Sequence, residues 1–342
     1  MKVFITGATG FIGTHVVRRL AETQHAVCCF VREKSDVREI EKIGATLVTG
    51  DLTDEDSLIV GMRGCDWLVN LAACTSYRQQ DKQVHVDVNV GGTLNVLQAA
   101  LQTGITKVVH ISPATVYGAQ HSQPFTEEAP LGSVPRGGHT TTKCTADMIA
   151  WHLYEKKGLP LVSVYPGYVI GPDDSKPSTF YRKSISVSEM ATRRNQSIIT
   201  FIHVKDVAEA IIRALENGSN IGEKYLLGKY ALSYHELDDL IFDVCGTPSV
   251  SRHLPYCVVK AIAALLTGMK MWFDGSKAER ELGIEYSPIR DALEEAIASH
   301  DELLRHQQIE IDHGLTDHDH IPFTYRYGLR VLESIPSYDS WS

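Results

Sequence analysis

Several features that mark whole classes of protein are absent from this sequence of 342 residues. No apolar run approaches the roughly 20 residues that a helix needs to cross a membrane, so no membrane segment is expected. The seven cysteines form no CxxC pair, and several lie in apolar stretches, where a thiol behaves as a small hydrophobic group. We therefore expect reduced cysteines and a cytoplasmic protein, because disulfides belong to oxidising compartments.

An excess of basic residues is also missing. The chain has 42 acidic and 33 basic side chains, and its formal net charge is -9. Nucleic acids and anionic membrane surfaces attract proteins of the opposite sign, so neither is expected as a partner. With 43% hydrophobic and 22% charged residues, the composition is typical of a globular protein, and a small molecule is the expected partner.

Short apolar runs alternate with longer amphipathic stretches in the first half of the chain, which predicts βαβ units and a parallel sheet. Past residue 165 the alternation loosens. We expect a first domain at 1–165, a smaller substrate-binding lobe at 166–308 that is partly interleaved with the sheet, and a C-terminal extension at 309–342. The expected strands are 2–6, 26–31, 46–48, 67–71, 107–112, 159–165, 198–204 and 224–227, and the expected helices are 11–23, 35–43, 54–62, 90–103, 139–157, 207–216, 234–245, 256–266 and 289–306.

A glycine-rich loop joins the first expected strand to the first expected helix. Its sequence is Thr6-Gly7-Ala8-Thr9-Gly10-Phe11-Ile12-Gly13, with the glycines spaced as GxxGxxG. Glycines at such a turn let the backbone approach a pyrophosphate, which then binds at the helix N-terminus. Because strand, loop and helix follow in the correct order, the sequence predicts a dinucleotide-binding domain of α/β class, with a doubly wound parallel sheet of the Rossmann type and a small C-terminal substrate lobe.

The glycine loop and six later motifs together resemble the extended short-chain dehydrogenase/reductases, and in particular their epimerase/dehydratase and dihydroflavonol-reductase-like group. The resemblance implies an enzyme that binds a nicotinamide dinucleotide and acts on a hydroxyl or carbonyl group, and it allows a homodimer. The later motifs are Gly50-Asp51-Leu52, Leu71-Ala72-Ala73, Val88-Asn89-Val90-Gly91-Gly92-Thr93, Ala114-Thr115-Val116-Tyr117-Gly118, Phe201-Ile202-His203-Val204-Lys205-Asp206-Val207-Ala208-Glu209-Ala210 and Ser276-Lys277-Ala278-Glu279-Arg280-Glu281-Leu282-Gly283.

The residues after the second expected strand indicate which dinucleotide is bound. An acidic residue there would bind a ribose 2′-hydroxyl, whereas an arginine would accommodate the 2′-phosphate of NADP. The sequence has Arg32, Glu33 and Lys34. Arg32 and Lys34 favour NADP(H), because a guanidinium binds phosphate oxygens in a bidentate manner, and Glu33 keeps NAD as the alternative.

The resemblance also assigns cofactor contacts at the ends of several strands. Asp51 and Leu52 would flank the adenine, and Pro166 and Val169 would lie near the nicotinamide. For the apolar members, packing in the core is the alternative explanation. The full expected set is Gly7, Thr9, Gly10, Phe11, Ile12, Arg32, Lys34, Asp51, Leu52, Leu71, Ala72, Ala73, Lys143, Pro166 and Val169.

The expected catalytic site departs from the pattern of the group at two positions. Members carry a tyrosine four residues before a lysine, so that both share a helix face and the ammonium lowers the pKa of the phenol. Lys143 is present and would hold the nicotinamide ribose, but His139 stands at the tyrosine position. Pro113 stands where a serine is usual, and because proline has neither hydroxyl nor N–H, Thr115 would have to orient the substrate oxygen.

Three interpretations of this altered pair stay open. In the first, His139 replaces the phenol, since imidazole titrates near neutral pH, and the chain is an NADP(H)-dependent oxidoreductase or epimerase-like enzyme. In the second, the chain binds its cofactor without turnover, as a redox sensor or a scaffold. In the third, the same fold catalyses a proton transfer or a dehydration without net redox chemistry.

Substrate contacts are expected from Tyr168 and Arg182. Arg182 belongs to a cationic stretch that would bind a phosphate or carboxylate, although solvated surface charge explains it equally well. Many sugar-nucleotide enzymes of the group carry asparagine at the position of Tyr168, so a nucleotide sugar is less expected. The run Asp317-His318-Asp319-His320 lacks the spacing of a zinc site, and no metal is expected.

Overall fold

The structure is a computed structural model that describes most of the chain. The described residues are 1–74, 82–118, 123–130, 138–174, 198–246, 258, 261 and 270–312, and within them the side chains of residues 82, 138, 139 and 306–312 lie outside the description. Within these ranges no helix combines the length and the apolar character that crossing a bilayer requires. Residues 313–342, which make up most of the expected C-terminal extension, are not among the described residues.

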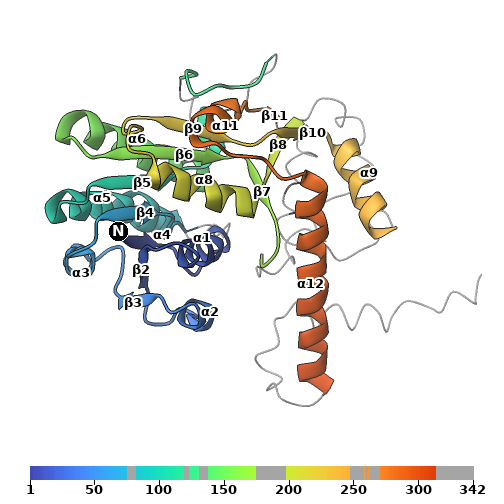
Figure 1. Ribbon diagram of the computed structural model, residues 1–342, viewed down its shortest axis with the longest axis horizontal. Coiled ribbons are helices and arrows are strands. Elements are labelled where there is room, and N and C mark those ends of the chain that lie inside the picture. Colours follow the sequence, from blue (N-terminus) through green and yellow to red (C-terminus); the bar gives the residue numbers. More distant parts are fainter. Residues whose placement is uncertain are drawn as a thin grey trace, which may run out of the picture.

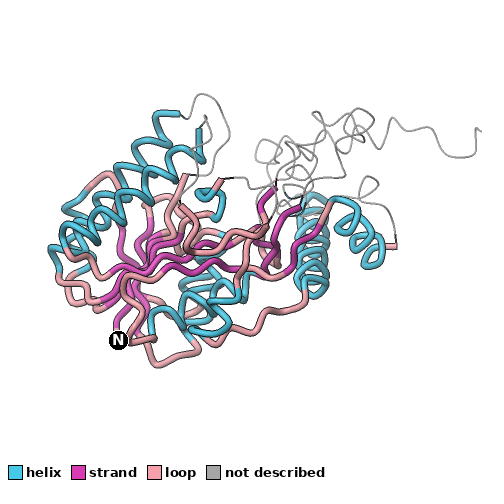
Figure 2. The backbone as a smooth tube through the Cα atoms, turned by 90° about the horizontal axis from the view of Figure 1, so that it is seen from above, coloured by secondary structure: helices cyan, strands magenta, loops and turns pink. Residues whose placement is uncertain are grey.

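Within the described ranges, seven strands form the main sheet, and every neighbouring pair in it is parallel (Figures 1 and 2). Their order across the sheet is β3-β2-β1-β4-β5-β6-β9. The first six positions have the order typical of the Rossmann fold, which confirms the predicted fold class. The strands are β1 (Lys2–Thr6), β2 (Ala26–Val31), β3 (Thr46–Thr49), β4 (Trp67–Asn70), β5 (Lys107–Ile111), β6 (Leu161–Pro166) and β9 (Lys224–Leu227).

Helices cover both faces of this sheet, as Figure 2 shows. Successive side chains of a strand point to opposite faces. Accordingly, Ile5 of β1 packs in the core with α1 (Phe11–Ala21), α8 (Val204–Glu216) and α11 (Ser276–Leu282). Its neighbour Phe4 packs in the core with α3 (Glu55–Met62), α5 (Gly92–Thr103) and α6 (Gly138–Lys157). Burial on both faces explains why these strands are continuous apolar runs in the sequence.

A second, smaller sheet lies beside the first. Its central strand, β8 (Ile198–His203), pairs with β10 (Tyr230–Leu232) in antiparallel fashion and with β7 (Tyr168–Ile170) and β11 (Lys270–Met271) in parallel. Helices α9 (Tyr234–Cys245) and α12 (Ile289–Asp312) pack with it in a core cluster that also includes Tyr165 of β6 and Leu226 of β9, and they lie on the side of the molecule away from β1 to β3 (Figure 1). Although β9 and α8 follow residue 165, they belong to the main sheet and to its helical layer.

The structure differs from the sequence expectations in a few elements. The expected helix 90–103 begins earlier, because α4 (Lys82–His85) runs through a π-helical segment, Val86–Gly91, into α5. Helix α2 covers only Arg38–Lys42 of the expected 35–43, and α12 continues past the boundary expected at residue 308. Of the expected helix 256–266, only Val258 and Ala261 are described, and both are buried.

Candidate cofactor and active site

The carboxyl ends of the parallel strands meet at one edge of the main sheet. The strand order reverses there between β1 and β4, because β2 and β3 lie on one side of β1 and β4, β5 and β6 lie on the other. In open α/β sheets this reversal leaves a crevice outside the carboxyl ends, in which ligands bind. The glycine loop follows β1, and Leu71 to Ala73 follow β4, so both expected cofactor segments lie at the reversal.

The glycine loop is folded so tightly that two of its glycines have no room for a side chain. Gly7 has a φ of +74°, and a Cβ placed on it would lie 2.7 Å from the backbone nitrogen of Ala72. A Cβ on Gly13 would lie 2.1 Å from the carbonyl oxygen of Gly7. The N–H of Gly10 donates to the same oxygen at 3.0 Å. Because Gly7 and Gly13 have no side chains, the backbones of strand β1, helix α1 and the end of β4 can approach one another this closely.

Helix α1 begins directly after this loop, and the N–H groups of its first three residues have no backbone acceptor among the described residues. Its N-cap, Gly10, provides no side-chain hydrogen bond, and the first turn contains no acidic residue. The N–H groups at a helix start have no partner within the helix and carry a partial positive charge. A cofactor pyrophosphate fits this position, because it supplies the acceptors and the negative charge that the helix start lacks.

Apolar residues of the expected set gather around the same crevice. Ile12, Leu71 and Val169 are partly buried and pack against one core cluster, although they come from α1, the end of β4 and β7. Leu52 lies against Gly92, where an added Cβ would approach the Cβ of Leu52 to 2.9 Å. The structure thus brings Ile12, Leu71 and Val169 together, whereas Leu52 packs against the core cluster on the other face of the sheet, and the packing of all four is compatible with both cofactor contact and a purely structural role.

Arg32 and Lys34 are exposed just beyond the end of β2. The backbone of Arg32 forms a turn with Ser35, whose N–H donates to the Arg32 carbonyl at 2.9 Å. Hydrogen bonds from Thr53 and the charge of Arg32 hold the pKa of Asp51 below its usual value, so the guanidinium lies within electrostatic reach of that carboxylate. Among the described residues, no carboxylate forms an ion pair with Arg32 within 4.0 Å.

Lys143 is buried beneath the carboxyl edge, with 5% of its surface exposed. Its Nζ donates to the carbonyl oxygen of Ile111 at 3.2 Å, which ties α6 to the end of β5. Burial lowers the pKa of Lys143 to about 8, against an opposing effect of Asp147. Burial, assisted by the charge of Lys143, lowers the pKa of His110 to about 3. Lys143 is therefore cationic at neutral pH and His110 is not.

The two altered catalytic positions are placed differently by the structure. His139 belongs to the first turn of α6, four residues before Lys143 and therefore on the same helix face, but its side chain lies outside the described residues. Pro113 is the N-cap of a short 3-10 helix, Ala114–Tyr117, and has the extended backbone that proline favours. Thr115, inside that helix, is half-buried.

One residue near Lys143 was not singled out from the sequence. Asn89 lies in the π-helical segment, and its Nδ2 donates to the hydroxyl of Thr142 at 3.1 Å. Its Oδ1 accepts from the N–H of Cys74 at 2.7 Å, and Nδ2 also donates to the Cys74 carbonyl at 3.1 Å. Asn89 therefore holds the segment after β4 against helix α6. The sequence signal for Asn89 is its place in the motif at residues 88–93. The structural signal is the π-helix around it, a feature common at functional sites.

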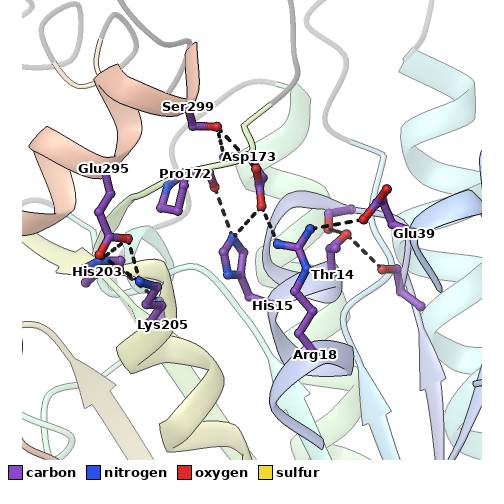
Figure 3. Close-up of polar contacts among 12 residues, drawn as sticks. Thr14, His15, Arg18, Glu39, Pro172, Asp173, His203, Lys205, Glu295 and Ser299 are labelled. Carbon is purple, nitrogen blue, oxygen red and sulfur yellow. Dashed lines mark hydrogen bonds and ion pairs between the residues drawn. The ribbon is translucent and has the colours of Figure 1, made fainter. Parts of the chain in front are cut away.

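A polar latch connects the start of α1 to the second sheet and α12 (Figure 3). We use the name for Asp173 and its partners His15, Arg18 and Ser299. Nε2 of His15 contacts the carbonyl oxygen of Pro172 at 3.1 Å, and the Arg18 guanidinium forms an ion pair with Asp173. The N–H of Asp173 donates to the Ser299 hydroxyl at 3.0 Å. The loop after β7 is thereby bound to the cofactor helix on one side and to α12 on the other.

The other expected substrate residues are less well defined. Tyr168 of β7 is half-buried, and its ring centroid lies 6.1 Å from that of Phe201. Arg182 lies outside the described residues. Within the part of the chain that the structure describes, no group of three or more histidine, cysteine, aspartate or glutamate side chains is arranged to hold a metal ion.

Known proteins resemble this chain along most of its length. It is 29% identical over 326 residues to a putative dihydroflavonol 4-reductase of Synechocystis, covering 86% of this chain and 93% of that protein. It is 28% identical over 278 residues to a 4-hydroxy-2-methyl-3-oxo-4-farnesyl-3,4-dihydroquinoline-1-oxide ketoreductase of Stigmatella aurantiaca, covering 80% and 81%. The crystal structure of a UDP-glucuronic acid 4-epimerase from Bacillus cereus with bound NAD superposes with a TM-score of 0.71 at 22% identity, covering 89% and 100%.

The match to a family model is consistent with these similarities and with the site. Residues 3–228 match the model of the NAD dependent epimerase/dehydratase family. This range contains the glycine loop, the segment after β2, Lys143 and the carboxyl ends of all seven strands of the main sheet. The chain belongs to the NAD dependent epimerase/dehydratase family.

Proposed function

We propose that this protein is an NADP(H)-dependent oxidoreductase that reduces a carbonyl group of a small molecule. The observation that carries the proposal is the buried cation of Lys143, one helical turn after His139 and beneath the edge at which the glycine loop opens. Reduction is preferred over epimerisation because the reductase and ketoreductase relatives are 29% and 28% identical, whereas the epimerase likeness, at 22%, concerns the fold.

The choice of NADP(H) over NAD(H) rests on Arg32. Its guanidinium is exposed at the end of β2 and forms no ion pair with a described carboxylate, so it can bind the 2′-phosphate without first breaking a contact. A guanidinium supplies two parallel N–H donors to phosphate oxygens. Lys34, also exposed nearby, adds a second positive charge.

In the proposed reaction the bound cofactor supplies a hydride to the carbonyl carbon of the substrate. Lys143 binds the ribose hydroxyls through its ammonium, Thr115 donates a hydrogen bond to the carbonyl oxygen, and His139 gives a proton to that oxygen as negative charge develops on it. One hydride and one proton convert the carbonyl to an alcohol, so the atoms and charges balance. A cation one turn from His139 favours loss of its proton, which assists the transfer.

The experiment combines cofactor binding with turnover. NADPH and NADH are titrated into the purified protein while cofactor fluorescence is recorded, and cofactor consumption is then measured with a panel of aldehydes and ketones. We expect NADPH to bind more tightly than NADH. His139→Ala should lower turnover by about a hundredfold or more at unchanged NADPH affinity, since a positioned acid contributes about 10²- to 10⁴-fold.

His139→Tyr is the matched variant, because it restores the phenol usual in the family. It should keep measurable turnover and shift the pH profile upward, as expected for a group with a higher pKa. Tight NADPH binding with no turnover in any of the three proteins would refute the reductase proposal and favour a cofactor-binding sensor. Pro113, which has neither hydroxyl nor N–H to orient a substrate oxygen, would then be one reason for the lack of turnover.

A further inference from the structure

A directed chain of hydrogen bonds runs between helix α6 and strand β6. The indole N–H of Trp151 donates to the hydroxyl oxygen of Tyr165 at 2.9 Å, and that hydroxyl donates to Oδ2 of Asp147 at 3.2 Å. Because an indole nitrogen can only donate, the Tyr165 proton is left for Asp147. The direction of the chain is therefore fixed, and Asp147 is its acceptor end.

Asp147 belongs to the same helix as Lys143. It follows Lys143 by four residues on α6, so both side chains project from the same face of the helix. Asp147 has no exposed surface, and Lys143 is 5% exposed. A buried carboxylate and a buried ammonium one helical turn apart stabilise each other's charged forms, since water is excluded from both.

Burial, one hydrogen bond and two cations act on the pKa of the Asp147 carboxyl group. Burial raises the pKa of Asp147 to about 6, whereas the Tyr165 hydrogen bond and the charges of Lys224 and Lys143 lower it. At neutral pH Asp147 is therefore ionised. Each element that packs around this pair contributes titratable groups: Lys143 and Cys144 of α6, His110 of β5, Tyr117 of the 3-10 helix, Tyr165 of β6 and Lys224 of β9. The Nζ of Lys224 lies 4.6 Å from the centre of the Trp151 ring.

We propose that Asp147 is a positioning residue that keeps Lys143 protonated and directed at the carboxyl edge, with Tyr165 and Trp151 fixing the carboxylate in place. The inference rests on the proposed function, because it takes Lys143 to bind the cofactor ribose. Without a nearby carboxylate, a buried ammonium gives up its proton more readily. A neutral amine has no charge to strengthen its hydrogen bonds to hydroxyl groups.

The test is Asp147→Asn, which keeps the shape and an acceptor for Tyr165 but removes the charge. NADPH affinity is measured by fluorescence from pH 6 to pH 10. In the unchanged protein the affinity should fall as Lys143 deprotonates, with a midpoint near its pKa of about 8. In the variant the midpoint should move down by about one pH unit, which weakens binding at pH 8 by about fivefold.

Two further variants show that the shift belongs to this pair. Asp206→Asn is the matched control, because Asp206, in the first turn of α8, is also a buried aspartate, at 6% exposure, but accepts its hydrogen bonds from Ser287. It should leave the midpoint unmoved. Tyr165→Phe removes the hydroxyl that donates to Asp147 and should move the midpoint in the same direction as Asp147→Asn, by a smaller amount.

A Lys143→Met variant separates failure of this inference from failure of the proposed function. If it loses NADPH affinity while the Asp147→Asn midpoint stays in place, the positioning role of Asp147 is wrong and the proposed function stands. If Lys143→Met binds NADPH normally, Lys143 is not a cofactor ligand and the proposed function is wrong.

The pH dependence of the free energy of unfolding tests the role of Asp147 without any cofactor. The pKa of Lys143 is lowered on folding, so between about pH 8 and 10.5 the unfolded chain holds more protons and stability rises with pH. In Asp147→Asn this rise should begin about one pH unit lower. An unchanged onset in urea titrations would overturn the role of Asp147.

Discussion

At the scale of single residues, Arg32 and Arg38 offer a controlled comparison. Both are exposed, but the Arg38 guanidinium is engaged by Asp36, with Nη2 and Oδ2 2.6 Å apart, whereas Arg32 has no such partner among the described residues. Arg32→Ser should weaken NADPH binding by about tenfold to a hundredfold and leave NADH binding unchanged, because a hydrogen bond to a charged group contributes about 1.5 to 3 kcal/mol.

Arg38→Ser is the control for this prediction and should change neither affinity. Dissociation constants for both cofactors, measured by fluorescence at one ionic strength, provide the comparison. Equal losses for NADPH and NADH in Arg32→Ser would contradict recognition of the 2′-phosphate.

The residues that the sequence could and could not identify differ in where their signal lies. Lys143 could be proposed as a site residue because its spacing from His139 on one helix is a local pattern. Asp147 is one turn further along the same helix, yet an aspartate is rarely fully buried unless it is paired, so only the packing of β5 and β6 against α6 shows that it has no exposed surface. The side-chain partners of Asn89, which lie in two other segments, likewise depend on the tertiary fold.

At the scale of elements, the turn from β1 into α1 allows a strict test. An alanine at Gly13 would place its Cβ against the Gly7 carbonyl, which is backbone and cannot rotate away. Gly13→Ala should lower the free energy of unfolding by about 1 to 3 kcal/mol through overpacking and weaken both NADPH and NADH.

Gly218→Ala is the matched control, because its added Cβ meets no atom within 4 Å. It should leave cofactor affinity intact. Thermal melts and fluorescence titrations of both variants are the measurements, and normal cofactor affinity in Gly13→Ala would show that the helix start does not bind the pyrophosphate.

Elements with a strong local pattern were predicted well, and elements set by packing were not. The bounds of β1, β2, β9 and α9 agree with the expected ranges, because buried apolar runs and a clear helical period mark them. The strands β7, β10 and β11 have two or three residues each, too few for any period to appear. The π-helical segment Val86–Gly91 also has no sequence period that would distinguish it from an α-helix.

At the scale of the whole molecule, the polar latch joins the cofactor helix to the second sheet and its helix α12 (Figure 3). Asp173 has a φ of +68°, which aspartate and asparagine tolerate better than most residues. Asp173→Asn should therefore keep the backbone and remove only the charge that Arg18 binds. The Arg18 side chain is 37% exposed and that of Asp173 42%, so the loss should be small, about twofold to fivefold in NADPH affinity.

Hydrogen exchange measures the same variant at the level of structure. Amides of α1 near Arg18 should exchange faster in Asp173→Asn, whereas Glu294→Gln, which removes a partner of Arg290 within α12, should leave the latch unchanged. The hydrogen bond and charge of Arg18 hold the pKa of Asp173 below its usual value despite partial burial. The contribution of the Asp173–Arg18 ion pair to stability is therefore complete above the pKa of aspartate in the unfolded chain, near 4. It is lost as the pH falls through the lower pKa of Asp173 in the folded protein.

The last strand of the main sheet, β9, has one side on which no described strand pairs with it. On this side the N–H of Leu226 donates to Oε1 of Glu127 at 2.8 Å. Unpaired N–H groups at a sheet edge are where a second chain can add a strand, the first step of edge-to-edge aggregation. Because Glu127 occupies this donor with a carboxylate, which cannot extend the sheet, a second chain would have to displace Glu127 before it could pair with β9 at Leu226.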